Sequence, residues 1–475
     1  MKTSSESERP GTGPEAPESG TDRRALQRPR IAKAAVLVVL SLLLFVFLGR
    51  LDHRLPCLGH SPRPAEPKTI EERVKHILSQ TPLIDGHNDL AITIRVSYNN
   101  HIYNETFSKP FAEGGLHGHV DIPRLKAGMS GGAFWSVFWP CPENGNDYSD
   151  ENYHSIVQQT LQQIDLISRL RQAHPSVFSP PTLTGAAALD HFRRRPGQLI
   201  SPLGIEGLHQ IGNSAAALRQ FHALGVRYAT LTHNCGNRFA DAALWERPLR
   251  RAPPVWGGVS PRGRRLVREM NRLGMVVDLA HVSVDTMLDG EGEGGGGWEG
   301  SRAPVIFSHS SAYALCPHPR NVPDEVLNLV REKRGLVMVN FNPEFVSCVA
   351  APGREDGLPD FYPRNSTLQQ VARHIVYIGK RIGYGHVGLG SDFDGIEQTP
   401  EGLEDVSKFP DLVAELLREG VSDEDAARVV GGNLLRVWRE VDAVAEEMQK
   451  AGEPVLEDEL PGLFPEQTWG PAREL

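Results

Sequence analysis

The stretch LIDGHNDL, residues 83–90, joins an apolar run to two side chains that can bind a metal ion, His87 and Asp89. If the run is a β-strand, both side chains point to the same side of it, because side chains alternate along a strand. They could then reach one ion together. The motif alone does not establish this, since a histidine in so short a motif is more often a satisfied polar residue of a loop. The rest of the chain has to supply further ligands.

Seven more apolar runs follow, separated by amphipathic stretches with helical periodicity. The eight runs end at His87, Trp139, Glu206, His233, His281, His309, Phe341 and Asp392. Continuous apolar strands that alternate with helices are typical of a parallel sheet covered on both faces, and eight units predict a (β/α)8 TIM barrel. The alternative is an open doubly wound sheet. Six runs end at or next to His, Asp or Glu, which favours the barrel, because its strand ends meet at one mouth.

The polar residues at these strand ends form a candidate metal site. Three imidazoles and two carboxylates would gather there, from His87, Asp89, Glu206, His281 and His309. These are more ligands than one tetrahedral site needs, and a carboxylate such as Glu206 can bridge two ions. Each histidine alone is more often a hydrogen-bonded core residue, but that explanation is poor for all five residues together.

Seven motifs around these positions resemble those of the membrane dipeptidase (renal dipeptidase) family, the binuclear-zinc members of the amidohydrolase-like barrels. They occur in the family's order, from about residue 70 to about residue 441, and read IDGHNDL, GIEG, LTHN, VVDLAHVS, VIFSHSSA, RNVPD and SDFDG. The resemblance implies a barrel of the metal-dependent hydrolase type that binds two Zn²⁺ ions per chain. His87 and Asp89 would hold the first ion, His281 and His309 the second, and Glu206 would bridge them.

The resemblance also implies roles for three further residues. His233 would contact the substrate carbonyl, Arg320 would receive the substrate carboxylate, and Asp392 would carry a proton beside the metals. A hydroxide bridging the zinc ions would hydrolyse dipeptides to amino acids, so that no Ser/His/Asp or Cys/His triad is needed. For Arg320 the alternative is a surface arginine in the Pro-flanked loop PHPRNVP. Alternative functions are hydrolysis of related amides, namely β-lactams or cysteinyl-glycine conjugates, and a non-catalytic surface receptor.

Five cysteines, none in a CxxC pair, make two disulfides and one odd thiol the natural count. The resemblance pairs Cys141 with Cys235 and Cys316 with Cys348; the alternative is buried free thiols. Cys57 then remains, and in an oxidising compartment an odd cysteine suggests a bond between chains. We therefore expect a homodimer that Cys57 can link, against the alternatives of palmitoylation or an idle thiol.

The first 69 residues differ in composition from the rest. Residues 1–33 predict a disordered cytosolic tail, the uncharged run 34–49 a transmembrane signal-anchor, and residues 50–69 a Pro-rich stem. A cleaved signal peptide is the alternative. Basic residues before the run place the N-terminus in the cytosol, which predicts a single-pass type II membrane protein with a lumenal or extracellular catalytic domain.

The remaining chain divides into a catalytic domain, residues 70–445, and a C-terminal extension, residues 446–475. Sequons at Asn104 and Asn365 predict N-glycosylation and agree with a location outside the cytosol. The net charge of −9 and the absence of a basic stripe beyond the N-terminus exclude a nucleic-acid binder.

Overall fold

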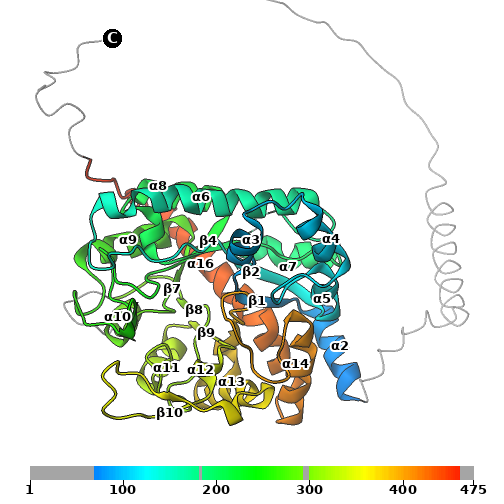
Figure 1. Cartoon of the computed structure of the whole chain (residues 1–475). Coiled ribbons are helices and arrows are strands. Elements are labelled where there is room, and N and C mark those ends of the chain that lie inside the picture. Colours follow the sequence, from blue (N-terminus) through cyan, green and yellow to red (C-terminus); the bar gives the residue numbers. More distant parts are fainter. Residues whose placement is uncertain (1–68, 181–183, 293–298, 461–475) are drawn as a thin grey trace, which may run out of the picture. The chain divides into compact units, whose positions relative to one another are not determined.

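Eight parallel strands form the centre of the computed structural model, which describes residues 69–180, 184–292 and 299–460 (Figure 1). Their order in the sheet follows the sequence, and each coincides with one of the eight predicted runs. The strands are β1 (Leu83–Asn88), β2 (Ser130–Ser136), β3 (Leu203–Glu206), β4 (Val226–Thr230), β7 (Val276–Asp278), β8 (Ile306–Phe307), β9 (Leu336–Val339) and β12 (Val387–Leu389).

The first and last strands of the sheet are joined just beyond their ends. Asn88 forms a parallel bridge with Phe393. The main-chain N–H of Asp392 donates to the carbonyl of His87 at 3.1 Å, and the N–H of Asp89 donates to the carbonyl of Phe393 at 2.9 Å. The fold is therefore an α/β barrel rather than the open doubly wound sheet that was the alternative.

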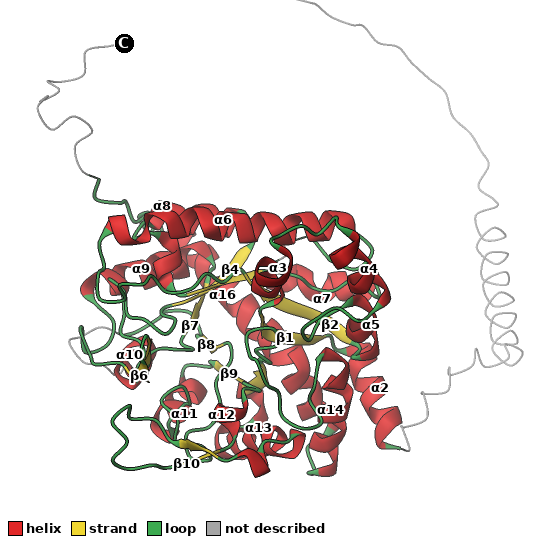
Figure 2. Cartoon of the chain, viewed as in Figure 1, coloured by secondary structure: helices red, strands yellow, loops and turns green. Residues whose placement is uncertain are grey.

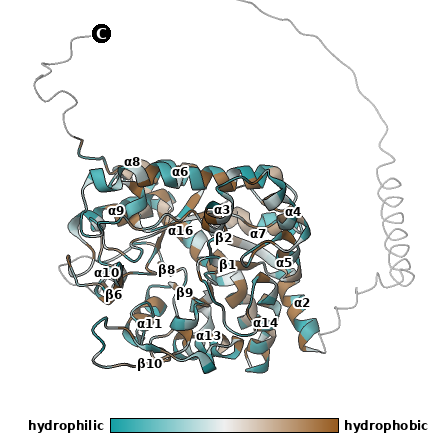
Figure 3. Ribbon diagram, in the orientation of Figure 1, coloured by the Kyte–Doolittle hydropathy of each residue, from teal (hydrophilic) through white to brown (hydrophobic). Residues whose placement is uncertain are grey.

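Helices surround the strands (Figure 2). They are α2 (Ile70–Gln80), α3 (Leu90–Tyr98), α4 (Glu105–Glu113), α5 (Ile122–Ala127), α6 (Asp150–Ala173), α7 (Gly185–Arg194), α8 (Ala215–Ala223), α9 (Pro261–Leu273), α10 (Val284–Glu291), α11 (Asp324–Glu332), α12 (Pro343–Val346), α13 (Leu368–Ile382), α14 (Phe409–Arg418), α15 (Asp423–Ala427) and α16 (Asn433–Lys450). Many begin at a Ser or Thr whose side chain accepts a hydrogen bond from a backbone N–H of the first turn, as Ser260 does for α9. Along the surface helices hydrophilic and hydrophobic residues alternate, so one side of each faces the core (Figure 3).

The amino ends of the strands are closed by α16, which crosses behind the strands in Figure 1. A buried cluster brings Ile84, Phe134 and Tyr228 of three strands together with Leu434 and Trp438 of α16. The predicted site belongs to the other end of the barrel, where the strands have their carboxyl ends. The predicted domain boundary at residue 445 falls inside α16, which continues to Lys450.

The chain beyond α16 lies along α8 and α9. The carboxylate of Asp458 accepts from the main-chain N–H of Ala215 at 2.7 Å and from the hydroxyl of Ser214 at 2.8 Å, which caps α8. Arg219 donates to the carbonyl of Leu456 at 2.7 Å. Residues 453–460 thus lie along the surface beside these two helices.

Two antiparallel strand pairs were missed by the sequence analysis. They are β5 (Leu244–Glu246) with β6 (Leu249–Arg251), and β10 (Cys348–Val349) with β11 (Asp360–Phe361). Strands this short carry too little alternation to be read from a sequence. The Gly-rich segment 289–300 begins inside α10, and its residues 293–298 lie outside the described part.

The predicted tail, anchor and most of the stem, with Cys57, also lie outside the described residues. Among the helices that the structure describes, none combines the length and the apolar character needed to cross a membrane. The described residues belong to one structural unit.

Candidate metal centre

The five predicted metal ligands all lie at the carboxyl ends of barrel strands. His87 is in β1, Asp89 follows β1 directly and Glu206 ends β3. His281 lies three residues beyond β7, and His309 two beyond β8. All five are buried, with exposed fractions of 5% or less. The barrel thus brings together residues that span more than 200 positions of the sequence.

Glu206 lies between the histidines. Its Oε1 is 2.9 Å from Nε2 of His281 and 3.4 Å from Nε2 of His309, and its Oε2 is 3.5 Å from Nε2 of His87. On the far side, Nε2 of His87 is 2.9 Å from Oδ2 of Asp89. One carboxylate therefore faces both groups of nitrogen ligands, as a bridge between two ions must.

The other ring nitrogens are held by neighbouring polar groups. Nδ1 of His281 is 2.9 Å from Oδ1 of Asn234, and Nδ1 of His309 is 2.8 Å from the hydroxyl oxygen of Ser308. Because the Ser308 hydroxyl donates to Asp278 at 2.6 Å, its oxygen accepts from Nδ1–H of His309. By this network both histidines carry their proton on Nδ1 and point the lone pair of Nε2 into the site.

A cation fits this arrangement better than any other occupant. Nε2 of His281 and Nε2 of His309 are 2.9 Å apart, with a lone pair on each. Burial lowers the pKa of both imidazoles well below the usual value, so no proton lies between them. Oδ1 of Asp89 is buried without a hydrogen-bond partner. Facing lone pairs beside an unpaired buried carboxylate oxygen are the donor set of a metal site.

The charges around His87 point the same way. Burial disfavours a charged imidazole there, but the interactions with Tyr228, Asp89 and Glu206 outweigh it and raise the pKa of His87. Burial likewise raises the pKa of Glu206. Positive charge is thus favoured at the centre of the cluster.

Two aspartates inside the strands support the site and were missed from the sequence. Asp278 accepts from the main-chain N–H of Ser308 at 2.8 Å and from Thr230 at 2.5 Å. Asp85 accepts from the main-chain N–H of Ser391 at 2.8 Å and from its hydroxyl at 2.5 Å. Each carboxylate fixes the residue before His309 or Asp392 across the sheet. An aspartate within an apolar run was the available signal.

Of the three predicted substrate residues, His233 lies beside the metal ligands. Its ring centroid is 4.4 Å from that of His281, and its Nδ1 is 3.6 Å from Sγ of Cys141. Burial and neighbouring cationic groups lower its pKa well below the usual value, so the imidazole is neutral. A neutral ring at this place can donate or accept a hydrogen bond.

Arg320 is buried, with 1% of its surface exposed, so the alternative of a surface arginine is wrong. Among the described residues its guanidinium makes long hydrogen bonds of 3.5 Å, to the hydroxyl of Ser310 and the carbonyl of His309, its Nε has no hydrogen-bond partner, and its Cζ lies 5.3 Å from the ring centroid of Phe345. Burial lowers the pKa of Arg320 to about 10, which leaves it charged at neutral pH. This cation has spare N–H groups for an anionic ligand.

Asp392 faces His87 from the segment directly after the last strand, β12. Its Oδ1 is 4.0 Å from Nε2 of His87, and its Oδ2 accepts from the amide of Asn340 at 3.0 Å. Burial, with Asp89 and Glu206 nearby, raises the pKa of Asp392 to about 7, against the opposing charges of His87 and Arg320. A carboxyl group with this pKa can take up and release a proton near neutral pH.

Two of these residues have left-handed backbones, His281 with φ 64° and Asp392 with φ 65°. A side chain in this region is strained by about 1–3 kcal/mol, and such strain persists where the surrounding structure enforces it. The hydrogen bonds of Asn234 to His281 and of Asn340 to Asp392 supply that support. The site is therefore shaped by the fold itself.

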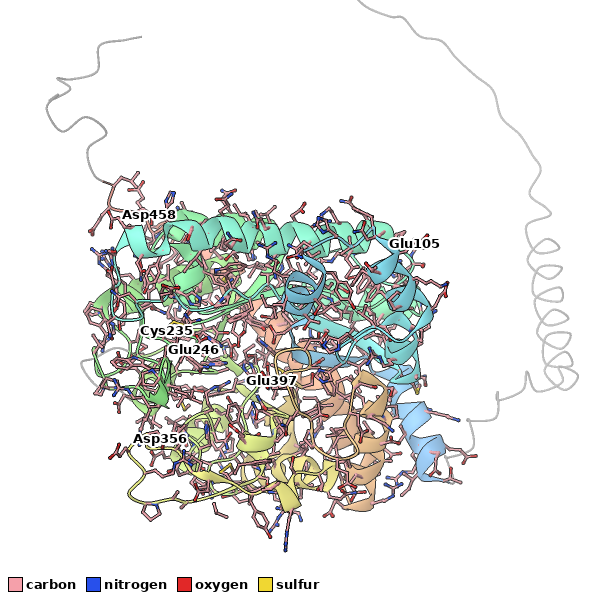
Figure 4. The ribbon with its side chains drawn as sticks, viewed as in Figure 1. Glu105, Cys235, Glu246, Asp356, Glu397 and Asp458 are labelled. Carbon is pink, nitrogen blue, oxygen red and sulfur yellow. A yellow bond between two sulfur atoms is a disulfide. The ribbon has the colours of Figure 1, made fainter. Side chains whose placement is uncertain are left out.

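Both predicted disulfides are present, Cys141–Cys235 and Cys316–Cys348, so the alternative of free thiols is wrong. The first lies next to His233 and lines a cavity of about 180 Å³ together with Glu246. Figure 4 shows Cys235 and Glu246 next to each other. Because the sulfur of Cys141 is bonded to that of Cys235, Cys141 offers no thiolate to a metal, although His209 and His233 lie near it.

Comparisons with known proteins agree with this geometry. A sequence profile of membrane dipeptidases, peptidase family M19, matches residues 71–452. Dipeptidase aclJ of Aspergillus oryzae is 46% identical over 391 residues, 82% of this chain and 85% of that protein. Dipeptidase tcpJ of Claviceps purpurea is 44% identical over 381 residues, 80% of this chain and 81% of that protein.

A solved structure gives the same result. The metallo peptidase from Rhodobacter sphaeroides, liganded with a phosphinate mimic of the dipeptide L-Ala-D-Ala, is similar with a TM-score of 0.61 and 26% identity. The match covers 76% of this chain and 99% of that one. This chain therefore belongs to the membrane dipeptidase family, peptidase family M19, and is a metallo-dipeptidase that hydrolyses dipeptides.

Proposed function

We propose that the metallo-dipeptidase uses two zinc ions. His87 and Asp89 hold one ion, His281 and His309 the other, and Glu206 joins them. The observation that carries the proposal is the pair of Nε2 atoms of His281 and His309, 2.9 Å apart and both facing Glu206. Imidazole and carboxylate ligands without thiolate or thioether suit zinc. We also propose that the α/β barrel is a (β/α)8 barrel of the metal-dependent hydrolase type.

The chain's own residues prepare the substrate and move the proton. When bound, the two ions would lower the pKa of a shared water toward neutrality and polarise the peptide carbonyl. Asp392, with its pKa of about 7, accepts the proton of the attacking water and passes it to the leaving amine. The neutral imidazole of His233 donates a hydrogen bond to the carbonyl oxygen as negative charge develops there.

Arg320 selects substrates by their length. Its buried guanidinium receives the free C-terminal carboxylate in a forked, charge-assisted pair. A peptide longer by one residue places an amide at this position and leaves the guanidinium unpaired, which is costly in a buried site. The preferred substrate is therefore a dipeptide, and any other amide accepted here carries a carboxylate at the same distance from the scissile bond.

The test combines metal analysis with activity. We expect about two zinc ions per chain, activity against dipeptides that a chelator removes and zinc restores, and little activity against tripeptides. A panel that includes a C-terminal D-residue, a β-lactam and a cysteinyl-glycine conjugate identifies the preferred amide. Glu206→Gln should remove activity while circular dichroism stays unchanged, because a neutral amide bridges two cations poorly. Full activity with one tightly bound zinc would contradict the two-ion site.

We further propose that the enzyme is a type II membrane protein, anchored by residues 34–49, with its catalytic domain lumenal or extracellular. Two disulfides support an oxidising compartment. Asn104 is exposed and Asn365 partly exposed, so both sequons are open to glycosylation. Cys57 then links two chains of a homodimer.

A further inference from the structure

Arg171, near the end of α6, is a buried cation without an anionic partner in the structure. Only 6% of its surface is exposed. One terminal nitrogen, Nη2, donates to the main-chain carbonyl of Ser201. The other two nitrogens, Nε and Nη1, are buried and have no hydrogen-bond partner. Arg171 thus resembles Arg320, whose spare N–H groups await the substrate carboxylate.

The charges around Arg171 make its burial more costly. The charged group that acts on it is Arg227, a second cation, which together with burial lowers the pKa of Arg171 to about 9. Asp442 attracts Arg227, and no carboxylate of the described residues acts on Arg171 in the same way. Arg171 is still charged at neutral pH. A buried charge without a partner is strongly unfavourable, so a counter-ion at this position would stabilise the fold.

Arg171 lines a surface cavity of about 700 Å³ between the end of α6 and α7, which we call the Arg171 pocket. The wall contributes further polar groups from several segments, namely Ser179, His191, Arg195 and Gln198. Nε2 of His191 is also buried without a hydrogen-bond partner. Phe178 and Pro175 supply an apolar part of the wall. The volume exceeds that of a single ion.

The Arg171 pocket lies at the opposite end of the barrel from the metal centre. Ser201, which Arg171 contacts, precedes β3, and its neighbour Ile200 pairs with Gly132 near the start of β2. The metal ligands lie at the carboxyl ends of the same strands. The pocket is therefore separate from the dipeptide site, and the catalytic mechanism does not use it.

We propose that the Arg171 pocket binds the phosphate group of a phosphorylated small molecule. Two nitrogens of Arg171 have unused N–H groups, and His191 of α7 and Arg195 directly after that helix line the same pocket. Donors that converge from several segments suit a tetrahedral oxyanion better than a planar carboxylate. The apolar wall receives the organic part of the ligand. That part belongs either to a soluble phosphate ester or to a phospholipid headgroup.

The experiment measures the melting temperature of the purified full-length enzyme during titration with inorganic phosphate at constant ionic strength, with chloride as the reference anion. We expect a saturable rise for the wild type. Arg171→Met should abolish the rise and melt no lower than the wild type in phosphate-free buffer, because it removes an unpaired buried charge. Arg194→Gln is the matched control: this exposed α7 residue pairs with Asp190 and lies outside the pocket wall, so it should respond as the wild type does.

If Arg171→Met does not fold, Arg195→Ala decides, since this exposed side chain is not needed for the core. It should weaken phosphate binding at least tenfold and leave dipeptidase activity unchanged. Glycerol 3-phosphate and dihexanoyl phosphatidic acid then distinguish the two sources: tighter binding of the second assigns the pocket to a lipid headgroup, and equal binding to a soluble ester. The proposal is overturned if the wild type does not respond to phosphate, or if the Arg171 and Arg195 variants respond as fully as the wild type does.

Discussion

A single guanidinium can be tested for its part in substrate selection. Arg320→Ala should lower kcat/KM for a dipeptide by about two to three orders of magnitude, because a buried charge-assisted pair is lost. The same dipeptide with an amidated C-terminus should lose far less, since it offers no carboxylate. Arg320→Lys keeps the charge without the fork and should fall between. Equal losses on both substrates would make Arg320 a structural residue.

Glu291, at the end of α10, provides a test through pH. Only 2% of its surface is exposed, and burial raises its pKa from 4.5 to about 8 in spite of Lys333. Between these two pH values the unfolded chain loses the proton and the folded chain keeps it, so the free energy of unfolding falls as the pH rises. Glu291→Gln removes this effect. The variant should gain stability over the wild type from about pH 4.5 to about pH 8, by at most about 5 kcal/mol, and the gain should then level off.

Denaturant unfolding at several pH values measures the difference. Glu332→Gln on α11 is the control, because its side chain is 60% exposed and should show no such trend. A gain for Glu291→Gln that is the same at pH 4 and pH 8 would mean that the wild-type carboxyl does not stay protonated in the fold.

At the scale of strands, helices and loops, the sequence predicts what depends on a simple repeat. The eight strands follow from apolar runs, and the site follows from the polar residues at the ends of six of them, because a barrel brings its strand ends together. The hydrogen bonds that hold the ligands do not follow. Asn234 reaches His281 from the loop after β4, and Ser308 orients His309 only because Asp278 of the neighbouring strand β7 accepts from its hydroxyl. Such contacts depend on packing between segments far apart in sequence, which no local pattern records.

The two disulfides should differ in their effects on stability. Cys141–Cys235 closes 94 residues and Cys316–Cys348 closes 32. Chain entropy predicts that removing the first costs about 4–5 kcal/mol and removing the second about 1 kcal/mol less. Cys141→Ser/Cys235→Ser should also lower kcat, since Cys141 lies against His233. Chemical denaturation and steady-state kinetics of the two double variants check this order. A reversed order in stability would show that strain or residual structure outweighs chain entropy.

At the scale of the whole molecule, composition predicts regions more readily than surfaces. The chain's division into an N-terminal region and a barrel is visible as a change from Pro- and Ser-rich sequence to regular alternation. The lack of a partner for Arg171 is not visible, because it depends on which carboxylates the fold places elsewhere: Asp442 lies near Arg227 instead. A sequence lists charges, and only the packed molecule pairs them.

The proposed anchor and covalent dimer can be examined together in the full-length protein. Non-reducing electrophoresis of membranes should show a dimer that a reductant splits, and Cys57→Ser should run as a monomer in either condition. Treatment with alkaline carbonate should leave the protein in the membrane fraction. A wild type that already runs as a monomer would contradict the covalent link, and release by carbonate would contradict the anchor.

The hydrogen bond between Asp392 and His87 joins the first strand of the barrel to the segment after the last. A ribosome therefore completes the first proposed metal ligand, His87, early and delivers the proposed proton carrier, Asp392, about 300 residues later. While the chain is being synthesised, β1 with His87 exists before the segment after β12, so the hydrogen bonds that close the barrel cannot yet form. Activity is thus acquired late in biosynthesis, after nearly the whole catalytic region has left the ribosome, and a prematurely terminated chain is inert as a peptidase.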